Sequence, residues 1–243
     1  MIRLHGPRRA RLALCALFAL EGCDATGRRY VEVPLQAQGA ERAPFEVDGW
    51  TVELARADVG FGPFWLCATE AASPEFCDAA VLELRRTVTV DGLEPLPDAV
   101  ATLNGITGTV RSGMWDYGVS WLPTASRARF NEGAPEGHSL VLRGVASRGS
   151  ERFAFEADVD LAPPMAGALV VRGQRVAAHD VTEGPDALTV RIDPRLWVQR
   201  MDFDRLAARA QDPVVLRPGD PDHEALVVAM TAGALPGLEW ARP

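Results

Sequence analysis

Four cysteines are the side chains of this 243-residue chain with the most chemistry to offer, and their positions suggest different roles. Cys15 lies inside a short apolar run, and Cys23 closes the tetrapeptide Leu20-Glu21-Gly22-Cys23. Cys67 and Cys77 stand close together in the body of the sequence. A thiol can be acylated, bridged to a second thiol or bound to a soft metal, and the compartment of the protein decides between these outcomes.

The first 22 residues have the features of a secretory signal. Four arginines precede the apolar run 12–20, which is far too short to span a bilayer. Residues 20–23 resemble a bacterial lipobox, which directs lipid attachment to its cysteine and cleavage before it, although Glu21 replaces the usual small residue. We therefore expect residues 1–22 to be a lipoprotein signal peptide and Cys23 to carry the lipid, palmitate included. Secretion with cleavage near Ala25 and a retained anchor are the alternatives.

Export gives the two remaining thiols a context. Cys15 would leave with the signal peptide, so Cys67 and Cys77 would meet in an oxidising compartment, where neighbouring thiols form disulfides. Residues 73–75 between them read Ser-Pro-Glu, which favours a turn that brings the ends together. We predict a Cys67–Cys77 disulfide. The alternative, a soft-metal site, lacks both CxxC spacing and a neighbouring histidine.

Charge excludes some classes of partner. The net charge is −8, and removal of residues 1–22 takes away four arginines and one glutamate, which brings it to −11. An acidic surface argues against nucleic acid and against direct adhesion to anionic lipid, so the acyl chains would supply the membrane contact. The chain has no lysine, a coding bias typical of GC-rich genomes.

The mature chain is long enough for one domain of sandwich type. Residues 23–44 are small and polar and predict a flexible tether, and residues 45–243 predict a single domain of β-sandwich type with helical C-terminal elements. The predicted fold class is mainly β, an antiparallel β-sandwich with short C-terminal helices. Its strands are expected at 50–57, 60–67, 81–90, 99–111, 118–122, 139–147, 152–161, 168–176 and 187–192.

The C-terminal part changes pattern. Residues 203–210 are rich in alanine, leucine and arginine and predict a helix. A second helix is expected to begin near Pro221, with Asp222 as its cap, and to end at Gly233. The tail 235–240 is expected to return as an edge strand.

An aromatic row is the best candidate for recognition. Trp115, Tyr117, Val119 and Trp121 fall at period two, so on one strand they would share a face. A sandwich core accounts for such a row. The competing hypothesis is an exposed stacking platform for a glycan or another flat ligand, built from Trp115, Tyr117 and Trp121.

Other chemistry has little support in the sequence. His138, His179 and His223 lack metal-binding spacing, although a composite site with Met114, Met165 or Met230 is an alternative. Ser120 lacks the second glycine of a GxSxG motif, and carboxylate pairs such as Asp158 with Asp160 fit solvated strand surfaces. We predict no catalytic residue, no metal ligand and no cofactor.

Three segments carry a family resemblance: 60–67 followed by Phe76-Cys77, the hairpin around 148–151, and 188–197 leading into Met201-Asp202-Phe203. Together they resemble uncharacterised secreted lipoproteins of GC-rich Gram-negative bacteria, myxobacteria among them. The resemblance implies an all-β exported domain and no activity. In layout the chain is also similar to periplasmic copper-associated proteins with cysteine pairs, but their four-cysteine pattern is missing here, and no metal ligands are carried over.

The functional hypothesis is therefore a lipid-anchored domain of the bacterial cell envelope, of binding or structural type and not an enzyme. Its folded part would lie in the periplasm or at the cell surface, with an unknown envelope protein or glycan as partner and no nucleic acid. The alternative is a periplasmic metal-handling accessory protein, associated with copper, or an envelope enzyme whose site assembles from loops.

Overall fold

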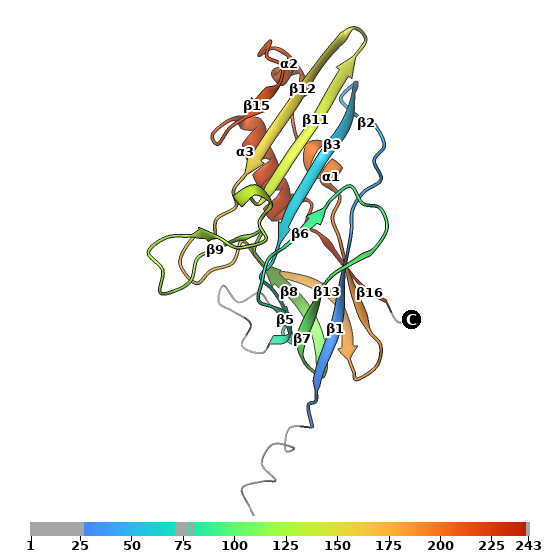
Figure 1. Cartoon of the computed structure of the whole chain (residues 1–243), viewed down its shortest axis with the longest axis vertical. Helices are drawn as coiled ribbons and strands as arrows, with labels where there is room; N and C mark the ends of the chain where they lie inside the picture. Colours follow the sequence, from blue (N-terminus) through green and yellow to red (C-terminus); the bar gives the residue numbers. More distant parts are fainter. Residues whose placement is uncertain (1–26, 71–76, 78–79, 242–243) are drawn as a thin grey trace, which may run out of the picture.

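The computed structural model describes residues 27–70, 77 and 80–241. The expected signal peptide and Cys23 lie outside these residues. Within them, no helix combines the length and apolar character needed to cross a bilayer. The molecule is elongated, with one sheet toward each end of its long axis (Figure 1). We call these the large sheet and the small sheet.

The large sheet has eight strands in the order β13-β8-β4-β5-β7-β1-β14-β16. Its pairs are antiparallel except for β1 with β14, which run parallel. The last strand pairs with β14 at the edge of the sheet, as the tail sequence predicted. The strands are β1 (Tyr30–Gln38), β4 (Phe64–Cys67), β5 (Ala80–Leu84), β7 (Asp98–Ile106), β8 (Gly108–Trp115), β13 (Val171–Val181), β14 (Ala187–Arg191) and β16 (Gly237–Ala241).

The small sheet follows the order β15-β12-β11-β3-β2, with β6 also paired to β3. Phe153, Phe155, Ala157 and Val159 of β12 are buried, and the residues between them are more exposed, as their alternation predicted. The predicted hairpin is present, since Arg148 pairs with Glu151 across the turn. The strands are β2 (Phe45–Val47), β3 (Trp50–Phe61), β6 (Val88–Asp91), β11 (Leu140–Arg148), β12 (Glu151–Val159) and β15 (Val214–Leu216).

The start of the folded body differs from the predicted tether. Residues 30–38 form β1, an interior strand that lies between β7 and β14. Val31, Val33, Leu35 and Ala37 are buried, and the residues between them are more exposed. Because this alternation buries one apolar face against the core, the segment folds as a strand and leaves no tether over these residues.

Short helices follow β14 along the chain. α1 (Pro194–Val198) and α2 (Phe203–Ala207) are capped by Asp193 and Asp202, whose carboxylates accept hydrogen bonds from backbone N–H groups of the first turns. α3 (Pro221–Val228) packs against β12, and a π turn (Ala229–Gly233) ends it where the sequence predicted. Asp222 is not its cap. The capping position is Asp220, and Asp222 is buried.

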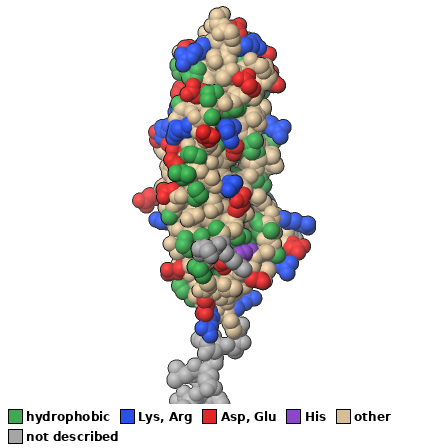
Figure 2. Space-filling model, turned by 90° about the vertical axis from the view of Figure 1, so that its right-hand side faces the viewer, with side chains coloured by type: hydrophobic (Ala, Val, Ile, Leu, Met, Phe, Trp, Pro, Cys, Tyr) green, Lys and Arg blue, Asp and Glu red, His purple; other side chains and the backbone are tan. Residues whose placement is uncertain are grey.

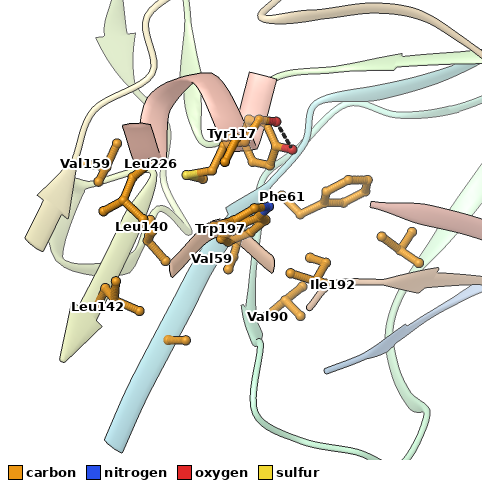
Figure 3. Close-up of a cluster of buried hydrophobic side chains, with 14 of the residues drawn as sticks. Val59, Phe61, Val90, Tyr117, Leu140, Leu142, Val159, Ile192, Trp197 and Leu226 are labelled. Atoms are coloured by element: carbon orange, nitrogen blue, oxygen red, sulfur yellow. Dashed lines mark hydrogen bonds between the residues drawn. The ribbon is translucent and has the colours of Figure 1, made fainter. Parts of the chain in front are cut away.

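One continuous core joins the two sheets and the helices. Figure 3 shows side chains of β3, β11 and α1 meeting there, among them Phe61, Leu140 and Trp197. Trp197 and Tyr117 are buried, and each donates a hydrogen bond to a backbone carbonyl of the C-terminal segment, at 2.8 and 2.9 Å. The mainly β, sandwich-like fold class with a helical C-terminal part is thereby confirmed.

The large sheet curls until its two edge strands meet. Gln174 of β13 donates a hydrogen bond to the carbonyl of Pro236, just before β16, at 3.1 Å. His179 of β13 stacks on Trp240 of β16, with ring centroids 4.0 Å apart and planes at 6°. These contacts give this half of the molecule a nearly closed, barrel-like form.

Candidate functional site

The aromatic row does not form a stacking platform. Trp115 and Tyr117 are 0% exposed, and Trp121 is half-buried. Trp115 packs on the rings of Phe61 and Phe64, with centroids 5.9 and 6.2 Å away. The platform hypothesis is therefore wrong for Trp115 and Tyr117, because both side chains lie in the core. Burial also raises the pKa of the Tyr117 hydroxyl.

The predicted disulfide is present. Cys67 and Cys77 are bridged, with their Cα atoms 5.6 Å apart. Cys67 ends β4 and is buried beside Met114 and Leu169. The bridge therefore fixes the end of an interior strand, a structural role.

The three histidines His138, His179 and His223 contact different parts of the protein. Each approaches a different carboxylate, and no group of three or more His, Cys, Asp or Glu residues suited to a metal ion is found in 27–70, 77 and 80–241. Met114 and Met230 are buried in the core, and Met165 is exposed. The closest nitrogen–oxygen pairs are His138–Asp160 at 2.8 Å, His179–Asp186 at 3.4 Å and His223–Glu224 at 3.5 Å.

A buried carboxylate lies directly after β8. Asp116 is 1% exposed. Its Oδ1 accepts a hydrogen bond from the backbone N–H of Val170 at 3.0 Å, and its Oδ2 accepts one from the Ser120 hydroxyl at 2.9 Å. Burial raises the pKa of Asp116 to about 7, and these two hydrogen bonds act in the opposite direction. Asp116 therefore changes charge near neutral pH.

Hydrogen bonds continue from Asp116 toward the surface. The Asn131 amide donates to Ser120 Oγ at 2.9 Å and to Thr87 Oγ1 at 3.2 Å, and the Thr87 hydroxyl donates to the carbonyl of Gly62 at 2.9 Å. Asp116, Ser120, Asn131 and Thr87 thus form one polar network. It connects the end of β8 with segments that are distant in sequence.

The backbone turn at Gly118 sets up this network. Gly118 has a φ of 77°, which L-residues with side chains rarely adopt. A Cβ there would also lie 3.0 Å from the Cβ of Ala134. The turn directs the chain into the two-stranded hairpin of β9 (Val119–Ser120) and β10 (Arg129–Phe130), and the N–H of Asn131 closes it by donating to the Gly118 carbonyl at 2.8 Å.

The outer end of the network opens into a groove of about 620 Å³ beside this hairpin. Ser120 and Asn131 belong to its lining, whereas Asp116 lies behind them. The hairpin projects from the side of the molecule where the two sheets meet (β9 in Figure 1). We call this the β9–β10 groove; its lining is Pro63, Arg85, Ser120, Leu122, Thr124, Ala125, Arg127, Arg129, Phe130, Asn131 and Glu132.

The groove combines positive charge with exposed apolar side chains. Three of its residues are arginines, and Glu132 is its one carboxylate. Arg85 pairs with Glu83 at 2.6 Å, but Arg127 and Arg129 form no ion pair within the described chain. Leu122 and Phe130 are 62% and 47% exposed, and both belong to this lining.

The groove lining offers charged, polar and apolar contacts. The Ser120 hydroxyl donates a hydrogen bond to Asp116 and accepts one from Asn131, and no described histidine forms a hydrogen bond with Ser120. Sequence reasoning considered Ser120 only as a hydrolase candidate and did not single out Arg127, Arg129 or Phe130. The sequence signal for these groove residues was the run Arg-Ala-Arg-Phe at 127–130, which follows the turn residue Gly118.

No protein-family model and no curated protein matches this sequence. Among solved structures, the chain is similar to "MbnP from Methylosinus trichosporium", with 11% sequence identity and a TM-score of 0.41. The match covers 83% of this chain and 88% of that chain. A likeness at this level carries no argument about ligand or chemistry.

Proposed function

We propose that this chain is a lipid-anchored binding domain of the bacterial cell envelope, that it is not an enzyme, and that the β9–β10 groove is its binding site. One observation carries the choice of site: a buried polar network reaches the surface there, among arginines without ion-pair partners and exposed apolar side chains. Binding sites commonly place a few fixed polar groups within an apolar surface.

The fixed geometry of the groove floor supports binding. Ser120 and Asn131 use their hydroxyl and amide hydrogens in hydrogen bonds to Asp116, Thr87 and each other, so their remaining acceptor positions are already oriented before a ligand arrives. Preorganisation of this kind lowers the entropic cost of binding. The flanking Thr124 is exposed and belongs to the same lining.

The proposed location rests on the sequence of residues 1–23. Labelled palmitate should be incorporated into the full chain expressed with its own signal, and Cys23→Ala should abolish the labelling. Cys15→Ala is the matched control, because Cys15 would leave with the signal peptide, and it should keep the label. Palmitate that is still incorporated after Cys23→Ala would contradict lipid attachment at this position.

The proposed site is tested by photo-crosslinking in cells that express the full chain. A photoreactive phenylalanine analogue at Thr124 should yield an adduct with an envelope component, whereas the same analogue at Arg152, an exposed position on β12, should not. Equal adducts at both positions, or none at Thr124, would refute the groove as the binding site.

A further inference from the structure

We propose that the β9–β10 groove recognises a carboxylate-bearing sugar, such as a uronate unit of an acidic polysaccharide. This inference rests on the proposed function, because it names the class of ligand for the same groove. Three independent properties of the groove lead to it: unpaired guanidinium groups, exposed apolar side chains and an oriented polar floor.

The first property is charge. Arg127 and Arg129 both line the groove and have no ion-pair partner in the described chain, although the protein carries a net charge of −8. On the face seen in Figure 2, by contrast, basic and acidic side chains are interspersed. A guanidinium presents paired N–H donors that match a carboxylate in bidentate geometry. Two free guanidiniums on one groove therefore favour an anionic ligand.

Glu132 limits how much negative charge the groove accepts. It is the single carboxylate of the lining and is exposed, and Arg85 is already engaged by Glu83. A ligand with one negative charge per unit fits two free guanidiniums beside one carboxylate better than a dense polyanion does, because like charges repel. This balance favours isolated carboxylates over polyphosphate chains.

The second property is apolar surface. Phe130 is 47% exposed, and Leu122 is 62% exposed. An inorganic anion would leave both side chains uncovered. A sugar ring has an apolar C–H face, which packs on an aromatic ring while its hydroxyl groups stay at the edge. Phe130 and Arg129 both belong to the groove lining, so one ligand could contact the ring and a guanidinium together.

The third property is the polar floor. Ser120 and Asn131 offer a hydroxyl and an amide to the groove, held by their bonds to Asp116 and Thr87. A fatty acid would cover these groups without hydrogen bonding to them, which costs free energy. The donors of Ser120 and Asn131 are used inside the network, so their oxygens are left as acceptors, and sugar hydroxyls can donate to these oxygens. Among carboxylates, the floor favours those on a polyhydroxylated ring.

The test uses the full chain, acylated and solubilised in detergent, and measures binding by isothermal titration calorimetry. The probe is trigalacturonate, and its methyl ester is the matched neutral control because it keeps the sugar and loses only the charge. We expect trigalacturonate to bind at least about tenfold more tightly than the ester, and more weakly as salt rises. Equal affinity for acid and ester would overturn the inference.

Variants connect the binding to the groove. The double variant Arg127→Gln/Arg129→Gln should reduce the affinity for trigalacturonate to that for the ester, and Phe130→Ala should weaken both ligands. Arg152→Gln, an exposed arginine on β12, should bind as the wild type does. All these positions are exposed, and matching melting temperatures would confirm folding. An unchanged affinity in the double variant would overturn the inference.

Two outcomes separate this inference from the proposed function. Inorganic phosphate that binds as tightly as trigalacturonate would reduce the groove to a simple anion site and refute the sugar. If trigalacturonate fails to bind while the crosslink at Thr124 persists, the groove remains a binding site and only the ligand class is wrong.

Discussion

Substitution of Asp116 by asparagine should remove a pH-dependent loss of stability. Asp116 is buried, and its pKa is raised to about 7 from 3.8. At a pH between these two pKa values, Asp116 is ionised in the unfolded chain and protonated in the folded chain. The free energy of unfolding therefore falls as pH rises. The contribution is fully present below about pH 4 and is lost as pH passes through 7. Asparagine keeps the shape and has no proton to lose.

The magnitude follows from the size of the shift. A displacement of about three pKa units corresponds to about 4 kcal/mol between the fully protonated and fully ionised limits. Between pH 5 and pH 8 only part of this range is covered, so we expect the variant to gain about 3 kcal/mol relative to wild type. The amide group introduced by Asp116→Asn can still accept a hydrogen bond from the Val170 N–H and form one with Ser120.

Urea unfolding followed by tryptophan fluorescence at several pH values measures this difference. Other titrating groups are common to both proteins, so their contributions cancel in the difference between the two free energies of unfolding. Asp98→Asn, which removes one exposed carboxylate, is the matched control for net charge. A difference between Asp116→Asn and wild type that does not change with pH would refute the reasoning. An identical profile for Asp98→Asn would assign the effect to net charge and not to burial.

Three further substitutions test structural roles by the same unfolding assay. Cys67→Ser/Cys77→Ser should lower the free energy of unfolding by about 3 kcal/mol, because the bridge closes a loop between residues ten positions apart. Trp115→Ala should lower it by about 3–5 kcal/mol, since the indole is fully buried. Arg205→Met should cost up to about 3 kcal/mol at neutral pH, because Asp222, 0% exposed, would lose its nearer charge partner at 2.7 Å and keep only Arg209 at 3.9 Å. Wild type treated with dithiothreitol should match the double serine variant, and a stability that reduction leaves unchanged would contradict the role of the disulfide. Arg191→Met breaks an exposed pair with Glu239 and should cost about 1 kcal/mol or less. An equal loss in Arg191→Met and Arg205→Met would show that burial of the partner does not matter. Trp115→Ala with wild-type stability would contradict the core position of Trp115.

Alternation and turn residues were sufficient to predict most of the fold. The β11–β12 hairpin, the edge strand at the C-terminus and the helix that begins at Pro221 lie where local patterns placed them. β1 was missed because it was taken for a polar tether, although Val31, Val33, Leu35 and Ala37 already alternate. Its parallel pairing with β14 joins residues about 150 positions apart, which local patterns cannot reveal.

The groove could not be predicted for the same reason. Pro63 and Arg85 reach it from segments far from the hairpin that supplies the other lining residues. The aromatic row shows the complementary limit: period two predicts a shared face on a single strand, but β8 ends at Trp115 and the chain turns at Gly118, and only the arrangement of the two sheets decides which of the side chains meet the core. Trp115 and Tyr117 meet the core.

The early start of β1 has a mechanical consequence. Tyr30 lies seven residues after Cys23, and an extended chain covers at most ~3.6 Å per residue, so an acylated Cys23 would hold β1 within about 25 Å of the membrane surface. β1 begins at one end of the long axis, opposite the β11–β12 hairpin (Figure 1). β7 and β14 pair with β1 on both sides, so the segment between Cys23 and β1 cannot lengthen unless the large sheet unfolds. Lipid attachment at Cys23, as proposed, would therefore keep the start of the large sheet close to the membrane and leave the β11–β12 hairpin at the other end of the molecule.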